Sequence, residues 1–422
     1  MFIKGNIIHT PTREKFEIFP KGYLEIAGGK VVALHLSLPK GVSQAEIIDY
    51  GELLLIPGYV DLHVHAPQYP NMGIGLDMEL LPWLNTYTFP EESKFKDLQY
   101  AKKVYSRFVH ELWKYGTTRS AVFASMHTEA TDLLLQLFQE SGLGAFAGKS
   151  LMDRNCPEYY VDTTENALAG VRILADKYNQ PNALVQSIIT NRFAPICTDE
   201  LQLGIAKLAF DYNLPVQSHL NENFGEIAWV KELYPDALSY AHVYHHFGQF
   251  GQTPTIMAHC IHNEESELEL MVEMSIYAAH CPHSNTNLGS GIMPVREFLN
   301  RGIRVGLGSD LSGGHKLAMN EVLVHAIQLS RLMWGASNKK QAALTLAEAF
   351  YLATKGGGEF FGKVGSFEAG YEADFLVIDD TGLGMPNTSI EQRLQRYLYV
   401  GDDRNIIKRY VRGKEVAEPT IY

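Results

Sequence analysis

Hydrophobic positions in the central part of the chain recur with two different periods. Short apolar runs with a period of two are typical of strands, and longer segments with apolar residues every three or four positions are typical of amphipathic helices. The strand-like runs lie within residues 56–68 and at 118–125, 145–151, 184–190, 214–219, 254–259, 275–280 and 303–310. Helical patterns separate them, and the clearest cover residues 97–115, 164–178, 198–212 and 264–273. A further helix is predicted over residues 345–355, where Thr345 and Glu348 form a capping-box pattern.

Eight alternating strand and helix units predict an α/β protein with a (β/α)8 barrel of the TIM type. An open, doubly wound sheet is the alternative interpretation of the same alternation. The two folds differ in how the carboxyl ends of the strands are arranged in space. Closure into a barrel brings the carboxyl ends of all strands to one mouth, whereas an open sheet spreads them along an edge. The residues at the strand ends therefore help to choose between them.

The two ends of the chain differ from its centre. Residues 1–56 and 364–422 contain short strand-like runs separated by turns, such as Gly28-Gly29. Each half-sized β segment is marginal by itself. We therefore expect the two segments to pair into one small composite β-sandwich domain, with residues 57–363 forming the barrel domain.

The connection after the first central strand is long and rich in aromatic residues. It covers residues 66–93 and includes Tyr69, Trp83, Tyr87 and Phe89. Long connections in compact domains are usually functional or disordered. The aromatic content favours a lid packed over a pocket, and a structural packing insert is the alternative.

Residues that can bind a metal stand at the ends of four predicted strands. His63 and His65 lie two positions apart, so both rings project from the same face of their strand. A lone pair of this kind is equally compatible with two polar residues on a surface strand. However, His219, His259 and Asp310 end three later strands, and closure of a barrel would bring all five side chains together.

These strand-end residues include a ligand set suited to zinc, with iron as the alternative. The predicted ligands combine nitrogen and oxygen donors and are His63, His65, His219 and Asp310. Such a set leaves a position open for water, and zinc lowers the pKa of a bound water toward ~7, which indicates catalysis. The fourth predicted strand has no lysine at its end that could carry a bridging carbamate. We therefore expect one metal ion per chain.

The predicted catalytic residues surround this metal site. Glu222 follows His219 by three positions and is predicted to shuttle protons to a ring nitrogen and a leaving amine. The alternative for Glu222 is a carboxylate at a helix N-terminus, favoured by the helix dipole. His259 is predicted to orient the hydroxide and Asp310 to accept its proton. Further histidines are expected at most in supporting positions, namely His127, His280, His283 and His315.

Composition narrows the classes of partner. The net charge of −12 over 422 residues, without a basic run, argues against binding to nucleic acid or to an anionic membrane surface. No apolar run approaches the roughly 20 residues of a membrane span. The four cysteines form no C-x-x-C pair, so a reducing cytoplasm is the expected compartment.

Several motifs together resemble the amidohydrolase superfamily. The segment 57–65, which contains His63 and His65, is the first of these motifs. His219, His259 and the Ser309-Asp310 pair follow it, and residues 365–374 resemble the usual return to the small β domain. The likeness spans nearly the whole chain. Shorter segments are similar to those members of the superfamily that deaminate guanine, and these are residues 65–69, 81–90, 123–128, 192–193, 218–222 and 280–285.

The resemblance implies zinc-dependent hydrolysis of guanine to xanthine and ammonia in purine catabolism, commonly in a homodimer. It implies attack of zinc hydroxide on the amino-bearing carbon while Glu222 shuttles protons. The substrate-binding residues that it implies are Gln68, Arg192 and Phe193, together with His65, His219 and Glu222. His283 departs from the pattern, because asparagine is expected there. The alternatives are a deaminase or chlorohydrolase of another heterocycle, such as 8-oxoguanine, a pterin or a triazine, and a scaffold without catalysis.

Overall fold

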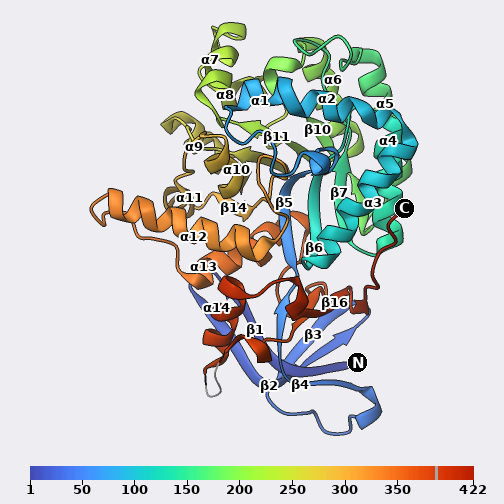
Figure 1. Ribbon diagram of the computed structural model, residues 1–422, viewed down its shortest axis with the longest axis vertical. Helices are drawn as coiled ribbons and strands as arrows, with labels where there is room; N and C mark the ends of the chain where they lie inside the picture. The colour runs from blue at the N-terminus through green and yellow to red at the C-terminus, as the bar shows by residue number, and fades with distance from the viewer. Residues whose placement is uncertain (385–387) are drawn as a thin grey trace.

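The computed structural model describes residues 1–384 and 388–422. Strands from the two ends of the chain lie side by side in one part of the molecule, and the alternating strands and helices of the central segment form the rest (Figure 1). The protein has an α/β architecture with parallel sheets in its central segment.

A seven-stranded sheet in the described residues combines both ends of the chain. In spatial order its strands are β17 (Lys414–Glu415), β16 (Ile406–Val411), β15 (Phe375–Ile378), β4 (Ile47–Pro57), β1 (Phe2–Thr12), β2 (Lys15–Ala27) and β3 (Lys30–His35). The junction is the antiparallel pairing of β15 with β4, in which Val377 lies opposite Leu55. Strands from both ends thus share one sheet, while the domain boundaries and the sandwich arrangement stay predictions.

The sequence of β4 explains how this sheet is held against the central segment. Successive side chains of a strand point to opposite faces. Leu55 therefore packs with Ile3 and Phe375 in a core of the terminal sheet, whereas Leu54 and Ile56 pack in the large core shared with the central helices. An apolar residue at every position of this part of β4 buries both faces of the sheet.

The central strands form two parallel sheets in the described residues. The first has the order β5 (Tyr59–His65), β6 (Thr117–Phe123), β7 (Gly144–Gly148) and β9 (Val185–Ser187). The second has the order β14 (Arg304–Leu307), β13 (Tyr277–His280), β12 (Thr255–His259), β11 (Val216–Leu220), β10 (Ile189–Asn191) and β8 (Ser150–Leu151).

Two of the predicted strands are each interrupted once. The predicted strand 145–151 is observed as β7 and β8, and the predicted strand 184–190 as β9 and β10. Gly148 lies at the first break, where a Cβ atom would come within 1.9 Å of the Ile188 carbonyl oxygen. A residue without a side chain is therefore required for the close approach between these strands. The first part of each interrupted strand belongs to the first central sheet and the second part to the second. The chain therefore passes directly from one sheet into the other at each interruption.

The first and last central strands are neighbours in space. The backbone N–H of Asp310, just beyond β14, donates to the carbonyl of His63 in β5 at 2.9 Å. The strand series thus returns to its beginning, which is consistent with a TIM barrel.

Helices separate the central strands, as the sequence pattern predicts, and three more follow the last of these strands in the described residues. In chain order, the α-helices of the described residues are α1 (Leu80–Trp83), α2 (Phe89–Glu92), α3 (Leu98–Lys114), α4 (Thr128–Ser141), α5 (Thr164–Tyr178), α6 (Asp199–Tyr212), α7 (Phe224–Leu233), α8 (Tyr240–His246), α9 (Glu265–Glu273), α10 (Pro282–Asn287), α11 (Val295–Arg301), α12 (Met319–Ala336), α13 (Leu346–Tyr351) and α14 (Ile390–Val400). Asp97 caps α3 by accepting from the backbone N–H of Gln99 and Tyr100. The predicted capping box of Thr345 and Glu348 is confirmed at the start of α13. Within the two described ranges, no helix is both long and apolar enough to cross a membrane.

Candidate active site

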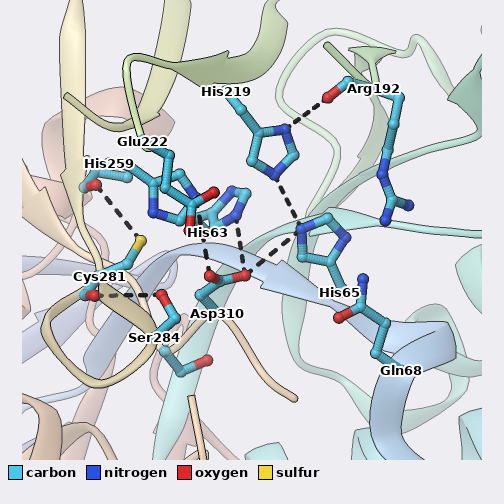
Figure 2. A network of polar contacts seen from close by, with 12 residues as sticks. His63, His65, Gln68, Arg192, His219, Glu222, His259, Cys281, Ser284 and Asp310 are labelled. Atoms are coloured by element: carbon cyan, nitrogen blue, oxygen red, sulfur yellow. Dashed lines mark hydrogen bonds and ion pairs between the residues drawn. The ribbon is translucent and has the colours of Figure 1, made fainter. Parts of the chain in front are cut away.

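The four predicted metal ligands lie together at the ends of central strands (Figure 2). The Nε2 atom of His65 is 3.2 Å from Nε2 of His219, which comes from β11. Oδ1 of Asp310 is 3.2 Å from Nε2 of His63 and 3.5 Å from Nε2 of His65. The two-residue spacing in β5 places both of its histidines toward the same point, where the later strands contribute the other two side chains.

The donor atoms of this cluster fit a divalent cation. Among the described residues, both ring nitrogens of His63 and Nδ1 of His65 are buried without a hydrogen bond, and unpartnered buried polar atoms are costly. The ligand atoms of His63, His65 and Asp310 lie within 4.8 Å of one another. Burial lowers the pKa of His65 and His219 well below its ordinary value, so both rings are neutral, the form that binds a metal.

Hydrogen bonds to residues outside the cluster orient the imidazole rings of His219 and of the neighbouring His259. Nδ1–H of His219 donates to the backbone carbonyl of Arg192 at 2.6 Å. Nδ1 of His259 lies 2.8 Å from Oδ1 of Asn285 and donates to it. In each ring the Nε2 atom is left with its lone pair directed into the site, as is usual for histidines around a metal.

The backbone adopts the left-handed conformation at several positions around the cluster. His259, Asp310 and Asn221 adopt φ values of 72°, 46° and 52°, in the left-handed region that side chains other than glycine rarely occupy. Such strain persists only where the surrounding structure holds it, and it concentrates at functional sites. Here it turns the chain at the ends of the strands and directs their last side chains into the site.

Glu222 lies in the loop after β11 and faces His259. Its Oε2 is 3.3 Å from His259 Nε2, and its Oε1 accepts from the hydroxyl of Ser290 at 3.1 Å. Helix α7 begins at Phe224 with Asn223 as its N-cap residue, so Glu222 lies just before the helix, and its carboxylate faces His259. Burial raises the pKa of Glu222 to about 8. A carboxyl group of this kind can take up and release a proton near neutral pH.

A cavity lies beside the histidine cluster, and its wall includes Glu222 and His259. The three residues implied as purine contacts line this cavity. Gln68 comes from the turn Ala66–Asn71 after β5, and Arg192 and Phe193 follow β10. Figure 2 shows Arg192 and Gln68 on the side of the cluster opposite Glu222 and His259. The apolar part of the lining comes from the long connection and from two other loops, and consists of Leu80, Trp83, Leu84, Phe193 and Leu288.

Cys281 and Glu92 are among the residues at or beside the site that were not singled out from the sequence. Cys281 follows β13, and its Sγ lies within 4.8 Å of ligand atoms of His259 and Asp310; its position after a strand end was the available signal. Glu92, at the end of α2, is fully buried and pairs with Arg192, with Oε1 and Oε2 both 2.8 Å from Nη1. No local pattern distinguishes Glu92, because its partner lies 100 residues further along the chain.

The histidines expected in supporting positions do not line this cavity. His280 and His283 are buried nearby, and His283 stacks on His315 with ring centroids 4.2 Å apart. His127 lies beside Tyr160, with a centroid distance of 6.1 Å.

Comparison with known proteins agrees with this fold and site. The sequence model of the amidohydrolase family matches residues 54–416. The chain therefore belongs to the amidohydrolase family.

Two similar relatives and one solved structure carry the same activity in their names. The guanine deaminase of Dictyostelium discoideum is 39% identical, with 98% of this chain and 97% of that protein aligned. The guanine deaminase of Escherichia coli is 36% identical over 88% of this chain and 84% of that protein. The crystal structure of guanine deaminase from C. acetobutylicum, with guanine bound in its active site, is 49% identical, covers 99% of each chain and superposes with a TM-score of 0.97.

Proposed function

We propose that this chain is a guanine deaminase, which hydrolyses guanine to xanthine and ammonia. The observation that carries the proposal is that two sets of polar residues face each other across one cavity. Glu222, a carboxyl with a raised pKa, faces the histidine cluster on one side, and Arg192 with Gln68 forms a polar edge on the other. The names of the similar relatives support the same activity.

We assign the metal as zinc, with iron as the alternative, and expect one ion per chain. The residues that would hold it are His63, His65, His219 and Asp310. When bound, zinc would lower the pKa of a water molecule toward ~7 and so supply hydroxide at neutral pH. Asp310→Ala is expected to reduce both zinc content and activity, and an unchanged zinc content would contradict ligation by Asp310.

Glu222 and Asp310 would transfer the protons of the reaction, with His259 beside them. Glu222 takes one proton from the attacking water and gives it to the ring nitrogen next to the amino-bearing carbon. His259 orients the attacking oxygen, because its Nδ1–H is held by Asn285 and its Nε2 faces Glu222 at 3.3 Å. Asp310 accepts the second proton, which the attacking oxygen loses, and this proton passes through Glu222 to the amino group, which leaves as ammonia.

The opposite side of the cavity would bind the purine. The guanidinium of Arg192 supplies donors for the purine carbonyl, and the amide of Gln68 pairs at the ring edge. Phe193 covers a face of the ring, while His65, His219 and Glu222 border the carbon that reacts.

We also infer the finer points of architecture and setting. A closed (β/α)8 barrel accounts for the contact between β14 and β5, and we expect a small terminal domain of residues 1–56 and 364–422. The cysteines are free, as expected in the cytoplasm. A homodimer acting in purine catabolism is the expected form, and light scattering of the purified protein tests the dimer.

The first experiment is ammonia release from guanine with metal content determined in parallel. Adenine, cytosine and 8-oxoguanine are the comparison substrates. Guanine-selective release with about one zinc per chain is the expected result. Zinc without guanine turnover would contradict the substrate while keeping the hydrolase, and protein purified without metal would favour a scaffold without catalysis.

A further inference from the structure

Glu92 joins the groups on the purine-binding side of the cavity. Its carboxylate is fully buried. Besides the two contacts to Arg192 Nη1, it accepts from Nε2 of Gln68 at 3.0 Å and from the hydroxyl of Tyr160 at 3.0 Å. We propose that Glu92 is a positioning residue that sets the selectivity for guanine, an inference that rests on the proposed function.

The carboxylate determines which end of the Gln68 amide faces the ligand. An ionised carboxylate only accepts hydrogen bonds, whereas a primary amide has one donating and one accepting end. With the Gln68 NH2 group held by Glu92 at 3.0 Å, the carbonyl oxygen Oε1 is the end left for a ligand. Gln68 therefore offers an acceptor.

The same carboxylate determines how Arg192 is presented. Both contacts use Nη1, so Nε and Nη2 remain as donors. A buried guanidinium requires a paired charge, and Glu92 supplies it without occupying the remaining donors. Arg192 is held as a donor beside the acceptor of Gln68.

This order of donor and acceptor matches one edge of guanine. Guanine presents a carbonyl oxygen next to a ring N–H, so the oxygen pairs with Arg192 and the N–H with Gln68 Oε1. An adenine-like edge has a lone pair on that ring nitrogen, which would face Oε1 without a proton between them. A site built in this way rejects analogues that leave its groups unpaired.

2-Aminopurine is the diagnostic substrate, because it carries the amino group on the same carbon but lacks both the carbonyl and the ring N–H. In Glu92→Gln the residue at position 92 can turn either end of its amide toward Gln68, so the orientation of Gln68 is no longer imposed. We expect kcat/KM for guanine to fall about 10- to 100-fold, mainly through KM, while the value for 2-aminopurine changes less than about threefold. The guanine to 2-aminopurine ratio therefore collapses.

Tyr160→Phe is the matched control. It removes another hydrogen bond to the same carboxylate but leaves Gln68 and Arg192 paired with it. Its guanine to 2-aminopurine ratio should equal that of the wild type. Equal losses for both substrates in Glu92→Gln, or an equal fall of the ratio in Tyr160→Phe, would overturn the role of Glu92, because a merely structural effect does not distinguish the substrates.

Two further measurements keep the test decisive. Glu92→Asp retains the buried charge with a shorter side chain, so it replaces Glu92→Gln if that variant does not fold, and it should lower the ratio by an intermediate factor. Wild-type protein that releases no ammonia from guanine defeats the proposed function. The role of Glu92 is then decided by calorimetric binding of guanine and 2-aminopurine, where a preference for guanine that is reduced in Glu92→Asp supports it and an unchanged or absent preference overturns it.

Discussion

Ser309 is bound to Asp61 through both its backbone and its side chain. The backbone N–H donates to Asp61 Oδ1 at 3.0 Å and the hydroxyl donates to Oδ2. Asp61 Oδ1 also accepts from the backbone N–H of His63 at 3.2 Å. One buried carboxylate thus joins β5 to the segment after β14 and positions His63 next to Asp310.

Asp61→Ala is expected to weaken metal binding without removing a candidate ligand. The variant leaves three buried donors unpaired, at about 1–3 kcal/mol each, and loosens the geometry of His63 and Asp310. Metal affinity should fall about 10- to 100-fold, as for other residues that support ligands. Competition with a chelator measures it. Ser309→Ala is the control, since it loses only the hydroxyl bond and should show a smaller effect, and unchanged zinc affinity in Asp61→Ala would argue against this role.

Glu222→Gln should retain zinc and lose turnover. The amide keeps the shape of the side chain but cannot carry the proton, and general acid and base groups contribute roughly 10²- to 10⁴-fold. Steady-state rates with guanine and metal analysis of the same sample test this. Ser290→Ala, which removes a hydrogen bond to Glu222, is expected to have a much smaller effect. Near-wild-type rates in Glu222→Gln would remove Glu222 from the mechanism.

Arg119 anchors the terminal sheet to the central strands. In β6 it donates from Nε to Asp374 and from Nη2 to Glu372, both at 2.6 Å. Arg119→Leu leaves buried Asp374 without its partner and should lower the free energy of unfolding by about 3–5 kcal/mol. Urea denaturation measures the change. The control is Arg404→Ala, which removes an exposed ion pair with Asp402 and should change stability by less than about 1 kcal/mol.

His283 should make the protein less stable in mild acid. Burial lowers its pKa from the ordinary 6.5 to about 3. As pH falls below 6.5, the unfolded chain takes up the proton first, so the contribution of His283 is complete above that pH and is lost toward pH 3. Between pH 6.5 and 5 the loss is about 2 kcal/mol.

Urea denaturation of His283→Asn at pH 7 and pH 5 tests this. The variant should lose less stability than the wild type over this interval, by about the same 2 kcal/mol. His246→Asn, at an exposed position, should follow the wild type. A wild-type pH dependence in His283→Asn would show that other groups cause the acid sensitivity.

The sequence by itself determined the local elements and most of the candidate site. The period of two predicted β5 with His63 and His65 on one face, and the helical period predicted residues 97–115, which are observed as α3 with Asp97 as its cap. The ends of later strands indicated His219 and Asp310. These features depend on residues a few positions apart, and hydrophobic periodicity and capping record such short-range requirements directly.

Only the tertiary structure decided which distant residues meet. The interruption of two strands and the bonds of Asp61 with Ser309 leave no local pattern. Glu92 is the clearest case, because it pairs with Arg192 across 100 residues. A carboxylate in a short helix looks the same in sequence whether it is solvated or buried. Its role depends on which charge the folded chain places beside it.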